Sequence, residues 1–209
     1  GREKKDDIFY RGDEMTMTWG EALRFVEEEG EKLSALQVKG KLTALYLHGP
    51  LRQLLYFLAL SYAGGVPVLY HEYLKEEDLW AMLEKQPVGL FLSDRNIPAF
   101  SMQQGRLYFR AWDRKAPLSC GFGVLTSGSS GLPKILYRRD ESWTDFFPLQ
   151  DEIFKVDGHS RLFFHGSLAF TGNLNMVMDF LSEGASLHGT SRLLPKTWMD
   201  RIQKEGITH

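Results

Sequence analysis

Nine consecutive residues near the middle of the chain have the composition that a phosphate-binding loop needs. Consecutive backbone amides in a loop of small residues can form an anion-binding concavity, hydroxyl groups add donors, and a lysine adds a full positive charge. The first six residues, Thr126 to Gly131, have small side chains, and four of them carry hydroxyl groups. We therefore predict that this segment binds a polyphosphate. Its residues are Thr126, Ser127, Gly128, Ser129, Ser130, Gly131, Leu132, Pro133 and Lys134.

Three other interpretations of this glycine- and serine-rich segment are open. It could be a flexible linker, but the apolar runs 123–125 and 135–137 on its two sides are typical of strands inside a domain. It could be a Walker A loop, but that motif ends in Gly-Lys-Ser/Thr, whereas Leu132 and Pro133 separate Gly131 from Lys134. It could also be an ordinary turn, because glycine and serine are common turn residues.

The elements that must position this loop alternate between helix and strand. Thr18 and Glu21 have the spacing of a capping box and predict a helix over 18–36. The apolar run 42–47 predicts a buried strand, and the apolar face of 50–62 predicts a helix that stops at Gly64. Further strands are expected over 66–70, 88–92, 106–112, 120–125, 135–139, 161–165 and 185–188, and further helices over 76–85, 142–154, 173–181 and 195–205.

This alternation predicts an α/β fold with a parallel, doubly wound sheet. Pro148 should interrupt the helix expected over 142–154, because proline removes a helical hydrogen bond. The strand expected over 106–112 alternates like a half-buried strand, and we expect it to connect two sheets.

The composition excludes several classes of protein. Lys and Arg number 25 against 27 Asp and Glu, so the net charge of -2 provides no field that would hold a nucleic acid. Cys120 is the only cysteine, which excludes internal disulfides and is compatible with a reducing, cytoplasmic location. The six histidines show no metal-ligand spacing, so no protein-ligated metal site is predicted. The longest apolar stretch, 54–63, is well short of the roughly 20 residues that span a bilayer, so no membrane span is expected.

The nine-residue motif resembles the signature Thr-Ser-Gly-Ser/Thr-Thr-Gly-x-Pro-Lys of the adenylate-forming superfamily. That superfamily includes acyl-CoA synthetases, the adenylation domains of peptide synthetases and luciferases. Eight of the nine positions match, and Ser130 is a conservative exception. The segments 63–68 and 181–185 resemble two further family segments, so the resemblance spans about 17–209. Ile135 departs from the pattern because the family usually has glycine there, and we expect it to change how the following strand leaves the loop.

The resemblance implies the three-layer fold of the family's amino-terminal domain, with mostly parallel doubly wound sheets. Residues 1–209 would form the amino-terminal part of an AMP-binding domain: a first α/β subdomain over about 17–117, then the phosphate loop and the start of a second subdomain over about 118–209. The family's adenine-binding, ribose-binding and late lysine motifs, and its carboxy-terminal lid, have no counterpart in this sequence. We therefore expect a fragment that does not begin at a natural start and is inactive alone.

The resemblance also implies an activity. The loop from Thr126 to Gly131, together with Lys134 as the catalytic residue, would hold the phosphates of ATP with Mg²⁺ while a carboxylic acid forms an acyl-adenylate. The thiol of CoA, or of the phosphopantetheine on an acyl carrier protein, would then take the acyl group. A ligase of this type would be a cytoplasmic enzyme, for example of fatty acid metabolism.

The segment 168–173 borders the acyl pocket in the family, which makes Phe170, Thr171 and Gly172 candidate substrate-binding residues. Amino-acid-activating members commonly place an aspartate in this stretch, and none is present here. We therefore favour a carboxylic acid without an α-amino group. An amino-acid adenylation domain and a non-catalytic nucleotide-binding or scaffolding protein stay open, as does a plain core position for Phe170.

Overall fold

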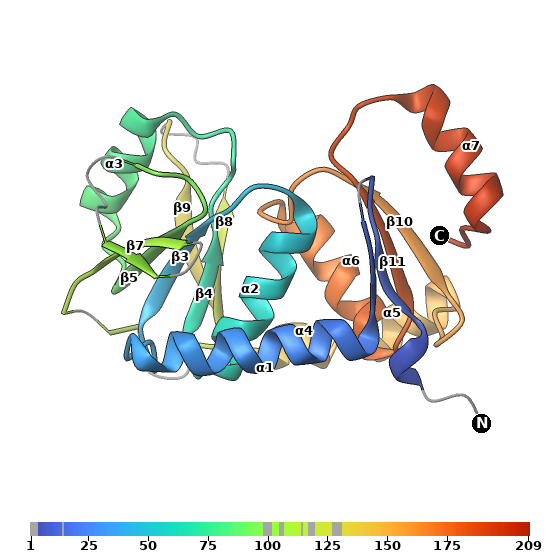
Figure 1. Cartoon of the computed structure of the whole chain (residues 1–209), viewed down its shortest axis with the longest axis horizontal. Coiled ribbons are helices and arrows are strands. Elements are labelled where there is room, and N and C mark those ends of the chain that lie inside the picture. Colours follow the sequence, from blue (N-terminus) through green and yellow to red (C-terminus); the bar gives the residue numbers. More distant parts are fainter. Residues whose placement is uncertain are drawn as a thin grey trace.

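The computed structural model describes residues 4–13, 15–97, 102–104, 107–113, 115–116, 120–126 and 131–209. Within these residues the strands form two sheets, side by side in Figure 1. The larger sheet contains, in spatial order, β6 (Met102–Gln104), β7 (Leu107–Ala111), β5 (Leu90–Ser93), β3 (Leu42–Tyr46), β4 (Val66–Leu69), β8 (Phe122–Thr126) and β9 (Lys134–Arg138). The smaller sheet contains β10 (Arg161–His165), β11 (Ser186–Thr190), β1 (Ile8–Arg11) and β2 (Thr16–Thr18).

The larger sheet has a parallel centre and antiparallel edges. β3 runs parallel to both β4 and β5, and β4 runs parallel to β8. β7 is antiparallel to β5, and β9 is antiparallel to β8. The expectation that the strand at 106–112 connects two sheets is therefore wrong, because β7 pairs with β5 of the same sheet over 108–111. Its alternating pattern predicted a half-buried strand correctly but carried no information about its neighbour.

The smaller sheet joins the two ends of the chain. β1 runs parallel to β11, which runs parallel to β10, and β2 closes the sheet as an antiparallel partner of β1. β8 and β9, which follow residue 117, belong to the larger sheet with β3, β4 and β5. Both sheets thus combine strands from distant parts of the sequence, and the division into subdomains near residue 117 stays a prediction.

The helices follow the sequence pattern closely. The capping box is confirmed, since the hydroxyl of Thr18 accepts from the amide of Glu21 and the Glu21 carboxylate accepts from the amide of Thr18. The helix expected over 142–154 is divided near Pro148, as predicted. The helices are α1 (Trp19–Ala35), α2 (Pro50–Tyr62), α3 (Glu76–Lys85), α4 (Glu141–Thr144), α5 (Phe147–Phe154), α6 (Thr171–Ser182) and α7 (Pro195–Glu205), preceded by a 3₁₀ turn at Lys4–Asp6.

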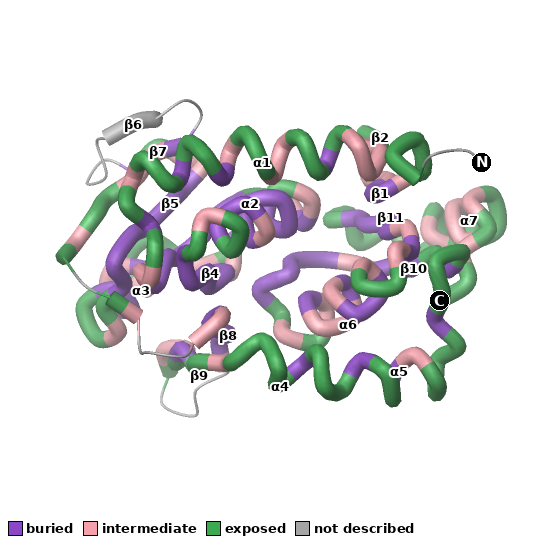
Figure 2. Tube along the Cα trace, turned by 90° about the horizontal axis from the view of Figure 1, so that it is seen from below, coloured by how far each residue is buried: buried purple, intermediate pink, exposed green. Residues whose placement is uncertain are grey.

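Two hydrophobic clusters make up the core. One combines residues of both sheets with α2 and α6, for example Phe9, Leu54, Phe122 and Phe180. The other lies on the opposite face of the larger sheet and includes Met82 of α3. The larger sheet is therefore covered on both faces, which confirms the α/β fold with layered, mostly parallel sheets. Figure 2 shows α2 and β4 mostly buried, whereas α1 is exposed along its outer side.

Candidate functional site

The two ends of the predicted phosphate loop lie next to each other at one edge of the larger sheet. Thr126 ends β8, Lys134 begins β9, and the two residues are paired across the strands. The hydroxyl of Thr126 also donates to the carbonyl of Lys134, at 3.3 Å. Because β8 runs parallel to β4, this edge is the one at which β3, β4 and β5 also end. Ligand sites of α/β sheets form at the carboxyl ends of such strands.

Within the loop, the structure describes only the residues at its ends. The predicted phosphate contacts Ser127, Gly128, Ser129 and Ser130 lie outside the described residues. Gly131 has a φ of 99°, and a Cβ there would meet nothing within 4 Å, so the backbone conformation and not crowding favours glycine. Lys134 is exposed at the start of β9. The described ends therefore suit an anion site, since they combine open space, a left-handed glycine and an accessible cation.

Ile135, the departure from the family motif, points into the core. It is 7% exposed and packs in the cluster beneath α3, whereas its neighbours Lys134 and Leu136 are exposed. The room for its side chain comes from Gly123 on the paired strand, because a Cβ at Gly123 would lie 3.0 Å from Ile135 Cγ2 and 3.1 Å from Val68 Cβ. The isoleucine side chain is therefore accommodated in the core, and β9 keeps its regular pairing with β8.

The three predicted substrate-binding residues lie where β10 leads into α6. Phe170 is the N-cap of α6 and is 53% exposed, so the interpretation of this residue as plain core is wrong. Thr171 begins α6 and is partly buried. Gly172 is exposed, and a Cβ there would meet nothing within 4 Å. The structure thus leaves free space around this turn, and the substrate-binding role of the three residues stays a prediction.

His71 connects this turn to the larger sheet. It follows β4, the strand next to β8, and its ring lies 4.6 Å from that of Phe170, centroid to centroid. Its Nδ1 atom is buried and has no hydrogen-bond partner among the described residues. Burial lowers the pKa of His71, so the imidazole is neutral at neutral pH. The sequence analysis gave His71 no role, although a polar residue directly after a predicted buried strand is a readable signal.

Two buried carboxylates, also missed from the sequence, hold the start of α2 at the same edge. Asp94 follows β5 and accepts from the amide of His48 at 3.1 Å and from Arg52 at 2.7 Å. Glu72 follows β4 and accepts from the amide of Gly49 at 3.0 Å, and it lies 2.8 Å from His48 Nδ1. Carboxylates are favourable partners for the amides at a helix start. These contacts fix α2 against the ends of three strands.

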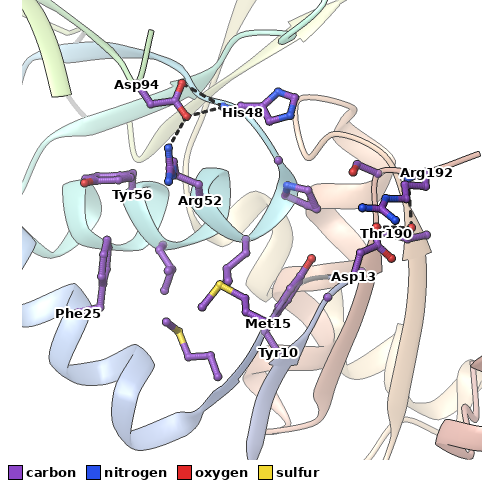
Figure 3. Close-up of a pocket in the computed structure, with 18 of the residues that line it drawn as sticks. Tyr10, Asp13, Met15, Phe25, His48, Arg52, Tyr56, Asp94, Thr190 and Arg192 are labelled. Atoms are coloured by element: carbon purple, nitrogen blue, oxygen red, sulfur yellow. Dashed lines mark hydrogen bonds and ion pairs between the residues drawn. The ribbon is translucent and has the colours of Figure 1, made fainter. Parts of the chain in front are cut away.

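A pocket of about 450 Å³ opens beside this cluster (Figure 3). It lies between the first turns of α2, the hairpin of β1 and β2, and the end of β11. Its lining combines the apolar Met15, Met17, Phe25, Leu51 and Leu55 with the polar His48, Arg52, Asp94 and Arg192. Leu51 and Leu55 face it, whereas Gln53 of α2 bonds the β10–α6 turn, at Leu168 N (2.7 Å). The pocket therefore lies on a different side of α2 from the predicted substrate residues.

Comparisons with known proteins agree with this architecture. No protein-family model matches the chain. A putative long chain fatty acid-CoA ligase, VraA, of Staphylococcus epidermidis is 20% identical over 188 residues, which are 90% of this chain and 40% of that protein. The protein of the same name from Staphylococcus aureus is 22% identical over 97% of this chain and 43% of its own length. The chain thus spans about two fifths of the length of these relatives.

Solved structures share the fold along the whole chain. o-Succinylbenzoate CoA synthetase (MenE) of Bacillus subtilis, in complex with the acyl-adenylate intermediate OSB-AMP, superposes with a TM-score of 0.79 at 16% identity, covering 99% of this chain and 58% of that one. The N-terminal subdomain of Klebsiella oxytoca NpsA, in complex with 3-hydroxybenzoyl-AMSN, gives a TM-score of 0.77 at 16% identity, covering 99% of this chain and 56% of that one.

The fold is that of the amino-terminal subdomain of the adenylate-forming enzymes, and the resemblance found in the sequence is confirmed. The two curated relatives carry the name putative long chain fatty acid-CoA ligase. Among the described residues, no helix is long and apolar enough to cross a membrane.

Proposed function

We propose that the polypeptide to which this chain belongs activates a carboxylic acid with ATP. A carboxylate oxygen attacks the α-phosphorus of ATP, the bond from that phosphorus to the bridging oxygen breaks, and acyl-adenylate and pyrophosphate form. The thiol of CoA, or of phosphopantetheine on an acyl carrier protein, then displaces AMP and gives a thioester. The observation that carries the proposal is the pairing of Thr126 with Lys134 at the two ends of a loop of small residues, at the sheet edge where the parallel strands end and where α/β proteins commonly bind ligands.

The described residues are compatible with a polyphosphate that carries Mg²⁺. Lys134 is exposed, Gly131 leaves open space, and Thr126 offers a hydroxyl at the same edge. No group of three potential metal ligands occurs in the described part of the chain. The loop of this chain would therefore reach Mg²⁺ through the phosphate oxygens that the ion coordinates. When bound, the ion neutralises charge on the leaving pyrophosphate.

Lys134 and the loop would act by electrostatic stabilisation. The pyrophosphate gains negative charge as it leaves, so donors aimed at its oxygens stabilise the transition state more than the ground state. In comparable oxyanion sites, loss of one such donor reduces the stabilisation of the transition state by about 3 kcal/mol. The predicted contacts at Ser127, Gly128, Ser129 and Ser130 belong to the same proposal.

The acid substrate would enter beside Phe170, Thr171 and Gly172. The exposed Phe170 ring against a neutral His71 provides a surface of low charge, and the segment 168–173 contains no acidic side chain that could pair with a substrate ammonium. We therefore favour a carboxylic acid without an α-amino group, such as a fatty acid. The single cysteine is compatible with a cytoplasmic enzyme. The nucleoside contacts would lie in the part of the relatives that this chain does not span.

The proposal is tested by exchange of labelled pyrophosphate into ATP, catalysed by the full-length polypeptide in the presence of candidate carboxylic acids. We expect exchange that depends on the acid, and a loss of about 100-fold in Lys134→Ala, which corresponds to about 3 kcal/mol. Lys196→Ala, at an exposed position at the start of α7, is the matched control and should exchange normally. Exchange without any acid, or an unchanged rate in a folded Lys134→Ala protein, would refute the proposal.

A further inference from the structure

Gln86 contacts the backbone on both sides of Lys134. It is the residue after the last turn of α3, and its side-chain amide reaches the beginning of β9. Its Nε2 donates to the carbonyl oxygen of Pro133 at 2.6 Å, and its Oε1 accepts from the amide of Ile135 at 2.5 Å. One side chain thus bonds the residue before the motif lysine and the residue after it.

The position of β9 in the sheet makes this contact informative. β9 is the edge strand next to β8, so one side of its backbone has no strand partner among the described residues. In a strand, successive residues direct their N–H and C=O groups to alternate sides. Lys134 is paired with Thr126 of β8, whereas Pro133 and Ile135 bond the Gln86 amide on the free side. The side-chain amide of Gln86 therefore makes the two backbone contacts that one residue of a further strand would make on this side of β9.

We propose that Gln86 is a positioning residue that acts on phosphate binding through Lys134. This inference rests on the proposed function. β8 holds the strand from one side and Gln86 holds it from the other, so the backbone that carries the lysine is fixed before a phosphate arrives. A preordered backbone lowers the conformational cost of binding, which is about 1–2 kcal/mol per residue that must otherwise be ordered. Gln86 itself is not a phosphate ligand in this proposal.

The contact also links the loop to α3. Leu79, Met82 and Leu83 of that helix are buried against the larger sheet, which fixes the helix end that carries Gln86. Ile135 is buried in the same cluster, so its side chain and its amide are both held. Misplacement by about 1 Å of a group that stabilises the transition state can cost 100-fold in rate. A partial loosening of the Lys134 backbone should therefore reduce the rate measurably.

A purely structural role would have different consequences. If Gln86 only stabilised the edge of the sheet, its loss would lower the melting temperature and reduce the amount of active protein, whether or not Lys134 is present. If it acts through the lysine, its loss must lower kcat for a fully folded enzyme, and that effect must disappear when the lysine side chain is removed. A double-mutant cycle separates the two cases.

The experiment uses the full-length polypeptide, acid-dependent pyrophosphate exchange and thermal unfolding. Gln86→Met has a similar length but neither donates nor accepts, and Gln203→Met places the same substitution at an exposed site in α7 as the control. We expect Gln86→Met to lower kcat about tenfold in the wild-type background. In the Lys134→Ala background, the same change should lower it less than about twofold, because coupled residues are not additive.

Each outcome bears on a separate claim. Equal losses in both backgrounds, or an unchanged kcat in Gln86→Met while Lys134→Ala is slow, would overturn the positioning role and leave the proposed function intact. Absence of acid-dependent exchange in the wild-type enzyme would overturn the proposed function and, with it, this inference. A variant that melts below the assay temperature is replaced by Gln86→Glu, which keeps the acceptor for Ile135 N and loses the donor to Pro133 O, and which should show the same dependence on Lys134.

Discussion

Asp179 of α6 is a buried acid whose replacement should stabilise the protein at neutral pH. Its side chain is inaccessible to solvent, and one oxygen accepts from Gln150 Nε2 of α5 at 2.9 Å. The other oxygen, Oδ1, has no hydrogen-bond partner among the described residues, and neither has Oδ1 of Asp151. Burial, aided by repulsion from Asp151 and Glu183, raises the pKa of Asp179 to about 6. We predict that Asp179→Asn keeps the bond to Gln150 and removes the cost of the buried charge.

The sign of the effect follows from proton binding. The folded protein holds the Asp179 proton up to about pH 6, whereas the unfolded chain releases it near the ordinary value of 3.8. Between these values the folded state binds more protons, so this residue makes the free energy of unfolding fall as pH rises, and the full cost is present above pH 6. About two pKa units correspond to at most about 3 kcal/mol. We expect about 1 kcal/mol, because the Gln150 bond and the polarisable protein interior screen the charge.

Urea unfolding of the wild-type protein and Asp179→Asn at pH 4, 6 and 8 measures this effect. The variant should be more stable by about 1 kcal/mol at pH 8 and equal to the wild type near pH 4, so that the two pH profiles converge on acidification. Asp200→Asn, at an exposed position in α7, is the control and should change neither profile. Parallel profiles, or a variant less stable at pH 8, would show that the carboxylate is not an unfavourable buried charge.

Two further predictions concern stability and are measured by the same unfolding assay. Gln53→Leu should lower the free energy of unfolding by about 2–3 kcal/mol, because it leaves the carbonyl of Leu47 and the amide of Leu168 buried without the partners that they have now. A decrease below about 0.5 kcal/mol would mean that neither group depends on Gln53. Thr18→Ala should lower the free energy of unfolding by about 1 kcal/mol, because it removes the capping box of α1, whereas Thr18→Ser should leave it nearly unchanged. Equal decreases in both variants would exclude capping as the cause.

The sequence predicted the elements whose signals are local. The capping box at Thr18, the buried run that became β3 and the interruption near Pro148 each depend on residues close together in the chain. β1 and β2 were missed because each is short and because β1 pairs with β11, from the other end of the sequence. A strand of four residues acquires its stability from such neighbours, which no local pattern reveals.

The residues of the candidate site also fall into those that have a signal in the sequence and those that have none. The phosphate loop stays a prediction from residue types, because small residues followed by a lysine suit an anion site and the structure describes only the ends of the loop. Gln86 could not be found, because a glutamine after the last turn of a helix looks like an ordinary surface residue until the fold brings it to β9. Glu72 and Asp94 were readable, since each is an acid two residues after a predicted strand, the place where ligand and helix-start contacts gather.

Ile135 shows why a departure from a family motif does not by itself imply a lost site. A glycine at this position would leave the start of β9 free to take several conformations. Here the isoleucine side chain fills a space that Gly123 leaves on β8, and its amide bonds Gln86. The strand is therefore specified by side-chain packing and one amide contact, while the pairing of Thr126 with Lys134 is retained. If this compensation holds, Ile135→Gly should bring the motif closer to the family pattern and yet weaken the position of Lys134, because the core cluster beneath it loses a buried side chain.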